Sequence, residues 1–248
     1  MTLKVEHLVG GYSQIPVLKD VSFEVQPHEL VGLIGLNGAG KSTTIKHIIG
    51  LLEPISGKIM IDGQTLITDP QEYKSKLAYI PETPILYDEL TLKEHIELTM
   101  MAYNLNHDEA WQKAQRLLKI FRLDKKLDWF PANFSKGMRQ KVMIVCAFIT
   151  NAKLFIIDEP FYGLDPLAIR DLITLINETK NKGAGVLMST HVLSTAQKIC
   201  DRFVMINKGT VAAVGDLHEL QQQYHHPNAD LSEIYLGMTQ GDIANANE

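Results

Sequence analysis

Apolar and polar residues alternate in two stretches near the start of the chain, within residues 3–5 and 21–25. A period of two is typical of half-exposed β-strands, and the Gly-Gly-Tyr-Ser segment at residues 10–13 predicts a turn between them. We therefore expect a small antiparallel β subdomain at the start.

A second pattern alternates short apolar runs with helical spacing. Residues 30–35 form an apolar run that ends in glycine, and residues 43–52 then repeat apolar positions every three or four residues. Strand-like runs return at residues 154–157, 186–189, 203–206 and 210–214. Asp165-Pro166 predicts a helix start, as an N-cap with proline at the first helical position. The alternation predicts an α/β fold with a mainly parallel sheet, and the last two runs predict a hairpin.

The stretch between residues 87 and 150 predicts an inserted helical lobe. Thr91 stands three residues before Glu94, which is the pattern of a capping box. One predicted helix face is apolar: Ala110, Ala114, Leu117, Leu118 and Phe121. Charged residues lie elsewhere on that helix and predict a solvated face: Lys113, Arg116, Lys119 and Arg122.

We divide the chain into residues 1–215, which hold these elements, and residues 216–248, a C-terminal extension of unknown role. The extension has three consecutive glutamines, the pair His225 and His226, and a polar end that we expect to be disordered. No internal repeat and no second glycine-rich loop occur in the sequence.

Composition narrows the classes of partner. The chain has 248 residues, 45% of them hydrophobic, and a net charge of −5 from 29 acidic and 24 basic residues, so broad attraction to nucleic acid is not expected. Cys146 and Cys200 are predicted to be reduced and buried, which suits the cytosol. Residues 1–10 do not resemble a signal peptide, and no apolar run approaches about 20 residues. We expect a cytoplasmic protein that does not cross a bilayer alone.

The strongest chemical signal is a phosphate-binding loop at residues 35–42, between a predicted strand and a predicted helix. Its backbone N–H groups and the helix N-terminus favour phosphate, Lys41 adds a charge, and Ser42 offers an oxygen to Mg²⁺. The alternative is a glycine-rich turn without a ligand. The candidate ATP-binding residues here are Gly35, Leu36, Asn37, Gly38, Ala39, Gly40, Lys41, Ser42 and Thr43.

Two adjacent carboxylates follow the apolar strand at residues 154–157. Ligands of parallel sheets bind at the carboxyl ends of strands, so Asp158 is a candidate Mg²⁺ ligand and Glu159 a candidate for polarising the water that attacks the γ-phosphate. The alternative is an acidic turn that ends the strand.

Three further segments resemble motifs of the ABC ATP-binding cassette family: Phe-Ser-Lys-Gly-Met-Arg-Gln-Lys at residues 134–141, Gly-Leu-Asp at 163–165 and Ser-Thr-His at 189–191. Each is weak alone, and an isolated histidine after a strand is more often structural. Their order, however, makes the chain from Tyr12 to about His191 similar to such a cassette. This resemblance implies a P-loop NTPase (RecA-like) core with an antiparallel β subdomain and an inserted α-helical lobe.

The resemblance also implies residue roles. Tyr12 matches the aromatic residue that stacks on adenine. Ser135 and Gly137 match positions that close over the γ-phosphate of a second cassette in a head-to-tail dimer. Asp165 matches the residue that links the two sites, and His191, with Lys41 and Glu159 in the catalytic set, matches the histidine that contacts the γ-phosphate.

The sequence departs from the commonest family pattern at three positions. Glu82 stands where many cassettes have a glutamine that senses Mg²⁺ and faces the membrane partner, and a glutamate can still bind Mg²⁺ through water. Lys136 replaces the first glycine of the signature pair, and Met138 replaces its terminal glutamine. Ser135 and Gly137 remain, so the backbone-donor role is retained.

Longer strings, at residues 35–50, 79–87, 129–143 and 156–167, resemble the ATP-binding subunits of Ecs-type bacterial ABC transporters. That likeness implies an EcsB-like polytopic membrane permease as partner, a peripheral location on the inner face of the cell membrane, and export of peptide-like cargo. The membrane subunit selects the cargo, so the resemblance implies the cargo less directly than the ATPase activity.

Two other classes of protein fit the sequence less well. A soluble ABC ATPase acting on ribosomes or DNA usually has two cassettes in one chain or a long coiled-coil insertion, and this chain has one phosphate loop and an acidic balance. A P-loop kinase or GTPase leaves Ser135, Asp165 and His191 without a role.

Overall fold

The computed structural model describes residues 1–12 and 15–240. Within them, nine strands hydrogen-bond in the order β4-β1-β2-β9-β8-β3-β7-β6-β5. Their bounds are β1 Leu3–Tyr12, β2 Ile15–Val25, β3 Leu30–Ile34, β4 Ser56–Ile61, β5 Leu77–Ile80, β6 Leu154–Asp158, β7 Gly185–Thr190, β8 Arg202–Asn207 and β9 Thr210–Gly215. β1 pairs antiparallel with β2 and β4, whereas β8, β3, β7, β6 and β5 run parallel to their neighbours in the core.

The core strands β3, β6 and β7 are buried along their whole length. Strands covered on both faces are expected to be continuously apolar, as β3 is along its length and β6 is up to Asp158. The predicted hairpin of β8 and β9 and the predicted α/β fold with an antiparallel β subdomain and a helical lobe are confirmed. β4, β5 and the helix between them were not predicted: each spans six residues or fewer, and β4 and the helix bury few of theirs, so their apolar patterns are weak.

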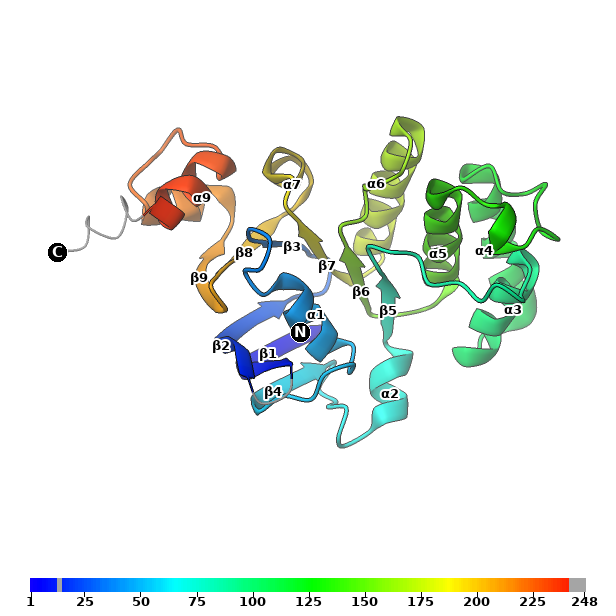
Figure 1. Cartoon of the computed structure of the whole chain (residues 1–248), viewed down its shortest axis with the longest axis horizontal. Helices are drawn as coiled ribbons and strands as arrows, with labels where there is room; N and C mark the ends of the chain where they lie inside the picture. Colours follow the sequence, from blue (N-terminus) through cyan, green and yellow to red (C-terminus); the bar gives the residue numbers. More distant parts are fainter. Residues whose placement is uncertain (13–14, 241–248) are drawn as a thin grey trace.

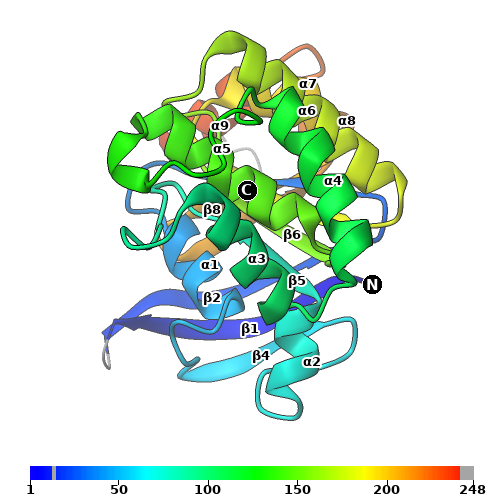
Figure 2. The same cartoon turned by 90° about the vertical axis from the view of Figure 1, so that its right-hand side faces the viewer.

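Helices cover both faces of the sheet. In Figure 1, α6 and α7 lie above the core strands and α5 lies to their right, while α1 lies below them, next to the antiparallel strands. Figure 2 shows α1 next to β1 and β2, and buried side chains of α1, β1, β2 and β3 share one apolar cluster. The helices are α1 Lys41–Ile48, α2 Pro70–Ser75, α3 Leu92–Ala102, α4 His107–Ile120, α5 Lys136–Ile149, α6 Pro166–Asn181, α7 Leu193–Ile199, α8 Leu217–Gln223 and α9 Leu231–Gln240, with a 3₁₀ turn at Pro131–Asn133.

α3, α4 and α5 form the lobe at one end of the molecule, with the Thr91–Glu94 capping box at the start of α3. The predicted apolar face of α4 is buried. The four charged residues are exposed as predicted, but Arg116 on α4 and Arg122 just after it also reach α6. Arg116 pairs with Glu178 at 2.7 Å and Arg122 with Asp171 at 2.9 Å, because α4 and α6 lie on the same side of the sheet.

The turn predicted at residues 10–13 is wrong for its first three residues, which belong to β1. At Gly10 and Gly11, the missing side chain lets neighbouring atoms pack closely against the backbone. A Cβ on Gly10 would lie 2.3 Å from His47 Nε2, and a Cβ on Gly11 would lie 2.2 Å from the carbonyl oxygen of Ile15. Ser13 lies outside the described residues.

Burial of His47 predicts a pH effect on stability. Its Nδ1 lies 3.0 Å from the carbonyl oxygen of Leu52, and no hydrogen-bond partner of Nε2 is found among the described residues. Burial lowers the pKa of His47, so the unfolded chain binds the proton more readily. The free energy of unfolding contributed by this group is therefore lost as pH falls below about 6.5.

We expect His47→Gln to flatten the decline in the free energy of unfolding between about pH 7.5 and pH 5.5, measured by urea unfolding. The same change at His218, which is exposed on α8, is the control and should leave the slope as it is. Equal slopes for wild type and His47→Gln would contradict the expectation.

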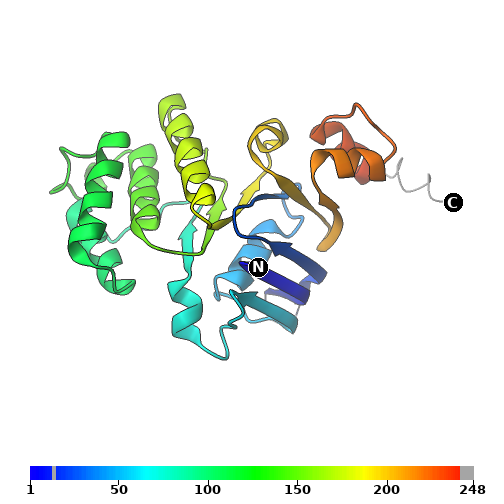
Figure 3. The ribbon, with the colours of Figure 1, turned by 180° about the vertical axis from the view of Figure 1, so that it is seen from behind.

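The described part of the C-terminal extension is folded. Leu220 of α8 and Leu231, Ile234 and Tyr235 of α9 are buried in a cluster with Phe203 of β8. Figure 3 shows these helices, orange to red, at the opposite end from the green helical lobe. Residues 241–248, where disorder was predicted, lie outside the described residues.

Both cysteines are free. Burial was predicted for both, and each is half-buried; burial raises the thiol pKa of Cys146 to about 11 and that of Cys200 to about 12. In the part of the chain that the structure describes, none of the helices has the length and apolar character that a bilayer span requires.

Candidate active site

Strand register brings the predicted motifs to one edge of the sheet. β3 and β6 both pair with β7, Ile34 lies opposite Thr190, and Asp158 lies opposite Ser189. The loops that follow these three parallel strands therefore leave the sheet at the same edge, where α/β proteins bind ligands. The phosphate loop, the acidic pair and His191 are thus neighbours, although they are far apart in sequence.

The phosphate loop connects β3 to α1, and its backbone requires glycine. Gly38 and Gly40 have φ values of 82° and 120°, in the left-handed region. A Cβ on Gly35 would lie 2.6 Å from the carbonyl oxygen of Ile206. Ser42 is exposed in the first turn of α1. The loop therefore presents backbone donors, a helix N-terminus and a hydroxyl group to a phosphate.

Lys41 is buried, with 6% of its surface exposed, and its ammonium group turns back onto the loop. Nζ donates to the carbonyl oxygen of Gly35 at 2.7 Å. Burial lowers the pKa of Lys41, and the negative charges of Glu159, Asp158 and Glu82 oppose that shift. The lysine charge therefore lies within electrostatic reach of three carboxylates.

Asp158 ends β6 and is buried. Its Oδ1 accepts a hydrogen bond from the Ser189 hydroxyl group of the adjacent strand. Burial raises the pKa of Asp158, the Ser189 hydrogen bond lowers it, and the charges of Glu82 and Glu159 raise it. No role was predicted for Ser189, although it begins the Ser-Thr-His segment.

Glu159 is held in place by β7 and the loop after it. Its backbone N–H lies 3.1 Å from Oγ of Ser189, and its φ of 46° is uncommon for a residue with a side chain. Its Oε1 lies 2.9 Å from Nδ1 of His191. The Glu159 carboxylate is 13% exposed and the His191 side chain is 57% exposed. This pair therefore presents a carboxylate oriented by an imidazole at the mouth of the phosphate loop.

Glu82 follows β5 and is exposed. Its charge raises the pKa of Asp158 and that of Tyr79, so it lies within electrostatic reach of the acidic pair. Among the described residues no group of three or more histidine, cysteine or acidic side chains is arranged to hold a metal ion by itself. Asp158 and Glu82 carry carboxylate oxygens, and Mg²⁺ binds proteins through one or two such ligands together with the substrate's phosphates.

Tyr12 lies at the end of β1, next to α1, with 49% of its surface exposed. Its hydroxyl oxygen accepts a hydrogen bond from Lys46 Nζ at 2.9 Å, and that nitrogen lies 5.1 Å from the ring centroid. The Lys46 hydrogen bond lowers the pKa of Tyr12. A ring fixed on one side and open on the other can stack on a flat base.

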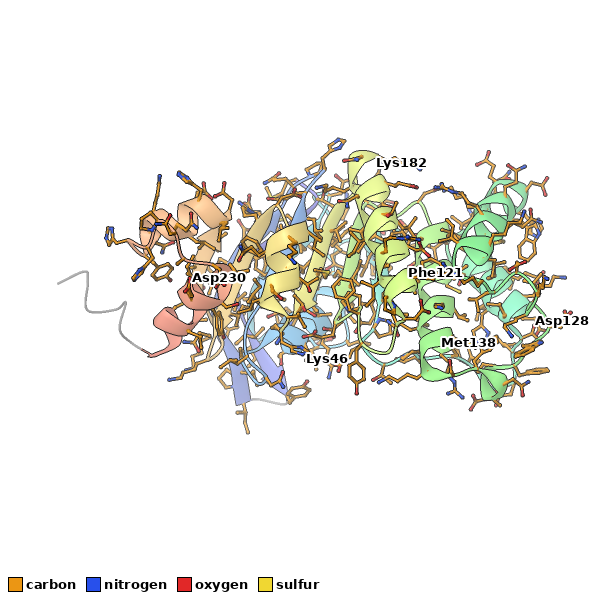
Figure 4. All side chains as sticks on the ribbon, turned by 90° about the horizontal axis from the view of Figure 1, so that it is seen from above. Lys46, Phe121, Asp128, Met138, Lys182 and Asp230 are labelled. Atoms are coloured by element: carbon orange, nitrogen blue, oxygen red, sulfur yellow. The ribbon has the colours of Figure 1, made fainter. Side chains whose placement is uncertain are left out.

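The signature segment lies away from the phosphate loop of the same chain. Ser135 is the N-cap of α5, and its hydroxyl group accepts from the backbone N–H of Met138, as predicted. Figure 4 shows Met138 and Lys46, which marks α1, near the same side of the molecule but separated along its length. Ser135 and Gly137 therefore do not join the phosphate loop within one chain.

The loop after Glu159 packs against the start of α5. A Cβ on Gly137 would lie 2.4 Å from the carbonyl oxygen of Gly163. Asp165 caps α6 and accepts from Lys141 Nζ at 2.6 Å, a hydrogen bond that lowers its pKa. The signature helix and the Asp165 loop are thus joined side by side.

Comparison with known proteins agrees with this geometry. The ABC transporter family model matches residues 18–162. The chain is 56% identical over 240 residues to the ABC-type transporter ATP-binding protein EcsA of Bacillus subtilis (strain 168), with 97% of each chain covered. A solved structure of the ATP-binding subunit of an ABC transporter has 54% identity and a TM-score of 0.94, covering 96% of this chain and 100% of that one.

A more distant ATP-binding cassette, solved as a dimer in a post-hydrolysis state with ADP and phosphate, is 25% identical with a TM-score of 0.77, covering 87% of this chain and 98% of that one. The fold, the site and these likenesses agree on one assignment. The chain belongs to the ABC transporter family, as an ATP-binding and ATP-hydrolysing subunit of a bacterial transporter.

Proposed function

We propose that this chain uses MgATP binding and hydrolysis to move an EcsB-like polytopic permease, which exports peptide-like cargo. The observation that supports this most is the meeting of the phosphate loop, Asp158, Glu159 and His191 at one edge of the sheet. In this proposal the cassette is residues 1–215, with the helical lobe at 87–150 inserted, and residues 216–248 are an extension.

MgATP is the substrate, and the proposed binding residues each have a physical reason. Backbone N–H groups of the phosphate loop and the N-terminus of α1 bind the β- and γ-phosphates, with Lys41 adding a full charge. Tyr12 stacks on adenine. Ser42 and Asp158 offer oxygen ligands to the magnesium ion of the substrate, and Glu82 reaches it through water.

Hydrolysis requires a base close to the attacking water. Glu159 is the residue we assign to that role, because its side chain is mostly shielded from solvent and its Oε1 is fixed by His191. His191 is exposed enough to turn toward the γ-phosphate while keeping Glu159 in position.

The active unit is proposed to be a head-to-tail dimer. ABC ATPases dimerise, and one of the solved relatives is itself a dimer. Ser135 and Gly137 lie apart from the phosphate loop of their own chain, at a helix N-terminus that favours anions. A second cassette in the reverse orientation supplies those donors, and Asp165 lies where the two sites meet.

Coupling to transport follows from differential affinity. If ATP binds the closed dimer better than the open one, the difference in binding free energy is available to move the permease, and hydrolysis resets the pair. The chain is then held at the inner face of the membrane by the permease.

Co-purification tests the partner. The chain is tagged in its native cell, membranes are solubilised in mild detergent, and proteins recovered at near-equal stoichiometry are identified. We expect a polytopic membrane protein in wild type and in a variant of an exposed residue on α8, His218→Gln, which serves as the control. Recovery of ribosomes or DNA without a membrane protein would replace the transporter proposal with a soluble ABC ATPase.

A further inference from the structure

We propose that α9 is a positioning element of the nucleotide site, and that Tyr235 is the positioning residue that acts through it. This inference rests on the proposed function of the phosphate loop and adds a role for the C-terminal extension. In this inference α9, which contains none of the cassette motifs, helps to set the affinity for ATP.

Two hydrogen bonds to one peptide group link α9 and Lys41 to the phosphate loop. The Tyr235 hydroxyl oxygen accepts a hydrogen bond from the backbone N–H of Leu36 at 2.8 Å. The carbonyl oxygen of the same peptide unit, on Gly35, accepts from Lys41 Nζ at 2.7 Å. The Gly35–Leu36 peptide is therefore held from both sides, by Tyr235 and by the phosphate-binding lysine. Rotation of that peptide would move the position from which Lys41 acts.

Tyr235 is suited to hold a backbone group firmly. It is 2% exposed, and its ring lies in the apolar cluster that includes Ile34, the last residue of β3 before the loop. Burial raises the pKa of the Tyr235 hydroxyl group, so the group stays neutral. Leu36 is 60% exposed, so its side chain does not fix the loop. Its backbone amide is fixed instead, by the hydrogen bond to Tyr235.

The same helix is also anchored to the element that follows His191. The backbone N–H of Leu231, at the start of α9, donates to Oε1 of Gln197 on α7 at 2.7 Å. Ala196 of α7 lies in the apolar cluster with Tyr235. α9 therefore contacts two elements beside the site, the start of the phosphate loop and the helix after His191.

The test compares two tyrosines of the extension in the full chain. Tyr235→Phe removes the hydrogen bond to the phosphate loop, and Tyr224→Phe removes one to the carbonyl oxygen of Ala212 in β9. We expect Tyr235→Phe to bind MgATP about three- to tenfold more weakly, with KM raised by a similar factor and kcat little changed. Tyr224→Phe should bind ATP as wild type does.

A purely structural role would lower the thermal midpoint without this split between KM and kcat. Unchanged ATP affinity in Tyr235→Phe, or equal weakening in both variants, would overturn the inference. Gln197→Ala loosens α9 without touching the loop and should weaken ATP binding in the same direction but less; unchanged affinity there would refute the anchoring of α9 through α7. If wild type itself does not bind ATP, the proposed function fails instead.

Discussion

The Glu159→Gln variant is expected to bind ATP as wild type does and to hydrolyse it at least about a hundredfold more slowly. The amide is nearly the same size as the carboxylate, so the hydrogen bond of its backbone N–H to Ser189 is retained. It cannot accept a proton from water, and a general base is worth about 10² to 10⁴ in rate. ATP binding with blocked turnover should trap a dimer.

Three measurements check this result: ATP affinity, turnover rate, and size-exclusion chromatography in MgATP. Glu178→Gln is the matched control. Glu178 lies near the far end of α6, where it pairs with Arg116 of α4, and it takes no part in the site. The control should turn over ATP normally and show no trapped dimer. Normal hydrolysis by Glu159→Gln would show that another group polarises the water.

The parts of the site that are local in sequence were predicted best. The glycine spacing in residues 35–42 predicts a loop whose backbone needs left-handed conformations, and Gly38 and Gly40 indeed have positive φ. The N-caps Ser135 and Asp165 also depend on a few neighbouring residues, and both were found where they were predicted.

The unpredicted contacts depend on elements that meet only in the folded chain. The Ser189 hydrogen bond to Asp158 follows from the pairing of β6 with β7. The hydrogen bond of Tyr235 to Leu36 joins residues 199 positions apart, and no periodic pattern contains that information. Glycines at positions 10 and 11 were interpreted as a turn because glycine marks close packing and turns alike.

The contacts around the signature helix bear on how two cassettes would communicate in the proposed dimer. Lys136 Nζ lies 3.9 Å from the centroid of the Tyr162 ring, and Gly137 packs on Gly163. These contacts join α5 to the loop that begins just after Glu159. A partner cassette that binds Ser135 and Gly137 to its own γ-phosphate would therefore also contact the loop next to this chain's Glu159, which links closure of one site to hydrolysis at the other.

The Lys41→Met variant is expected to lose ATP affinity by about ten- to a hundredfold, because a hydrogen bond to a charged group contributes about 1.5 to 3 kcal/mol. Methionine keeps the unbranched apolar stem that packs in the buried site, so the fold should be retained. In wild type the ammonium group is already desolvated and bonded to Gly35, so a phosphate gains a charge partner at little further cost in desolvation.

Two further variants separate the effect of the Lys41 charge from that of its side-chain shape, with ATP binding measured by titration. Lys119→Met removes a charge from the exposed face of α4 and should bind ATP as wild type does. Lys41→Arg keeps the charge, but its planar guanidinium group is larger than an ammonium group, and Lys41 itself is only 6% exposed. We expect Lys41→Arg to bind ATP nearly as poorly as Lys41→Met. Restored affinity in the arginine variant would mean that charge alone matters, and unchanged affinity in Lys41→Met would remove Lys41 from the phosphate site.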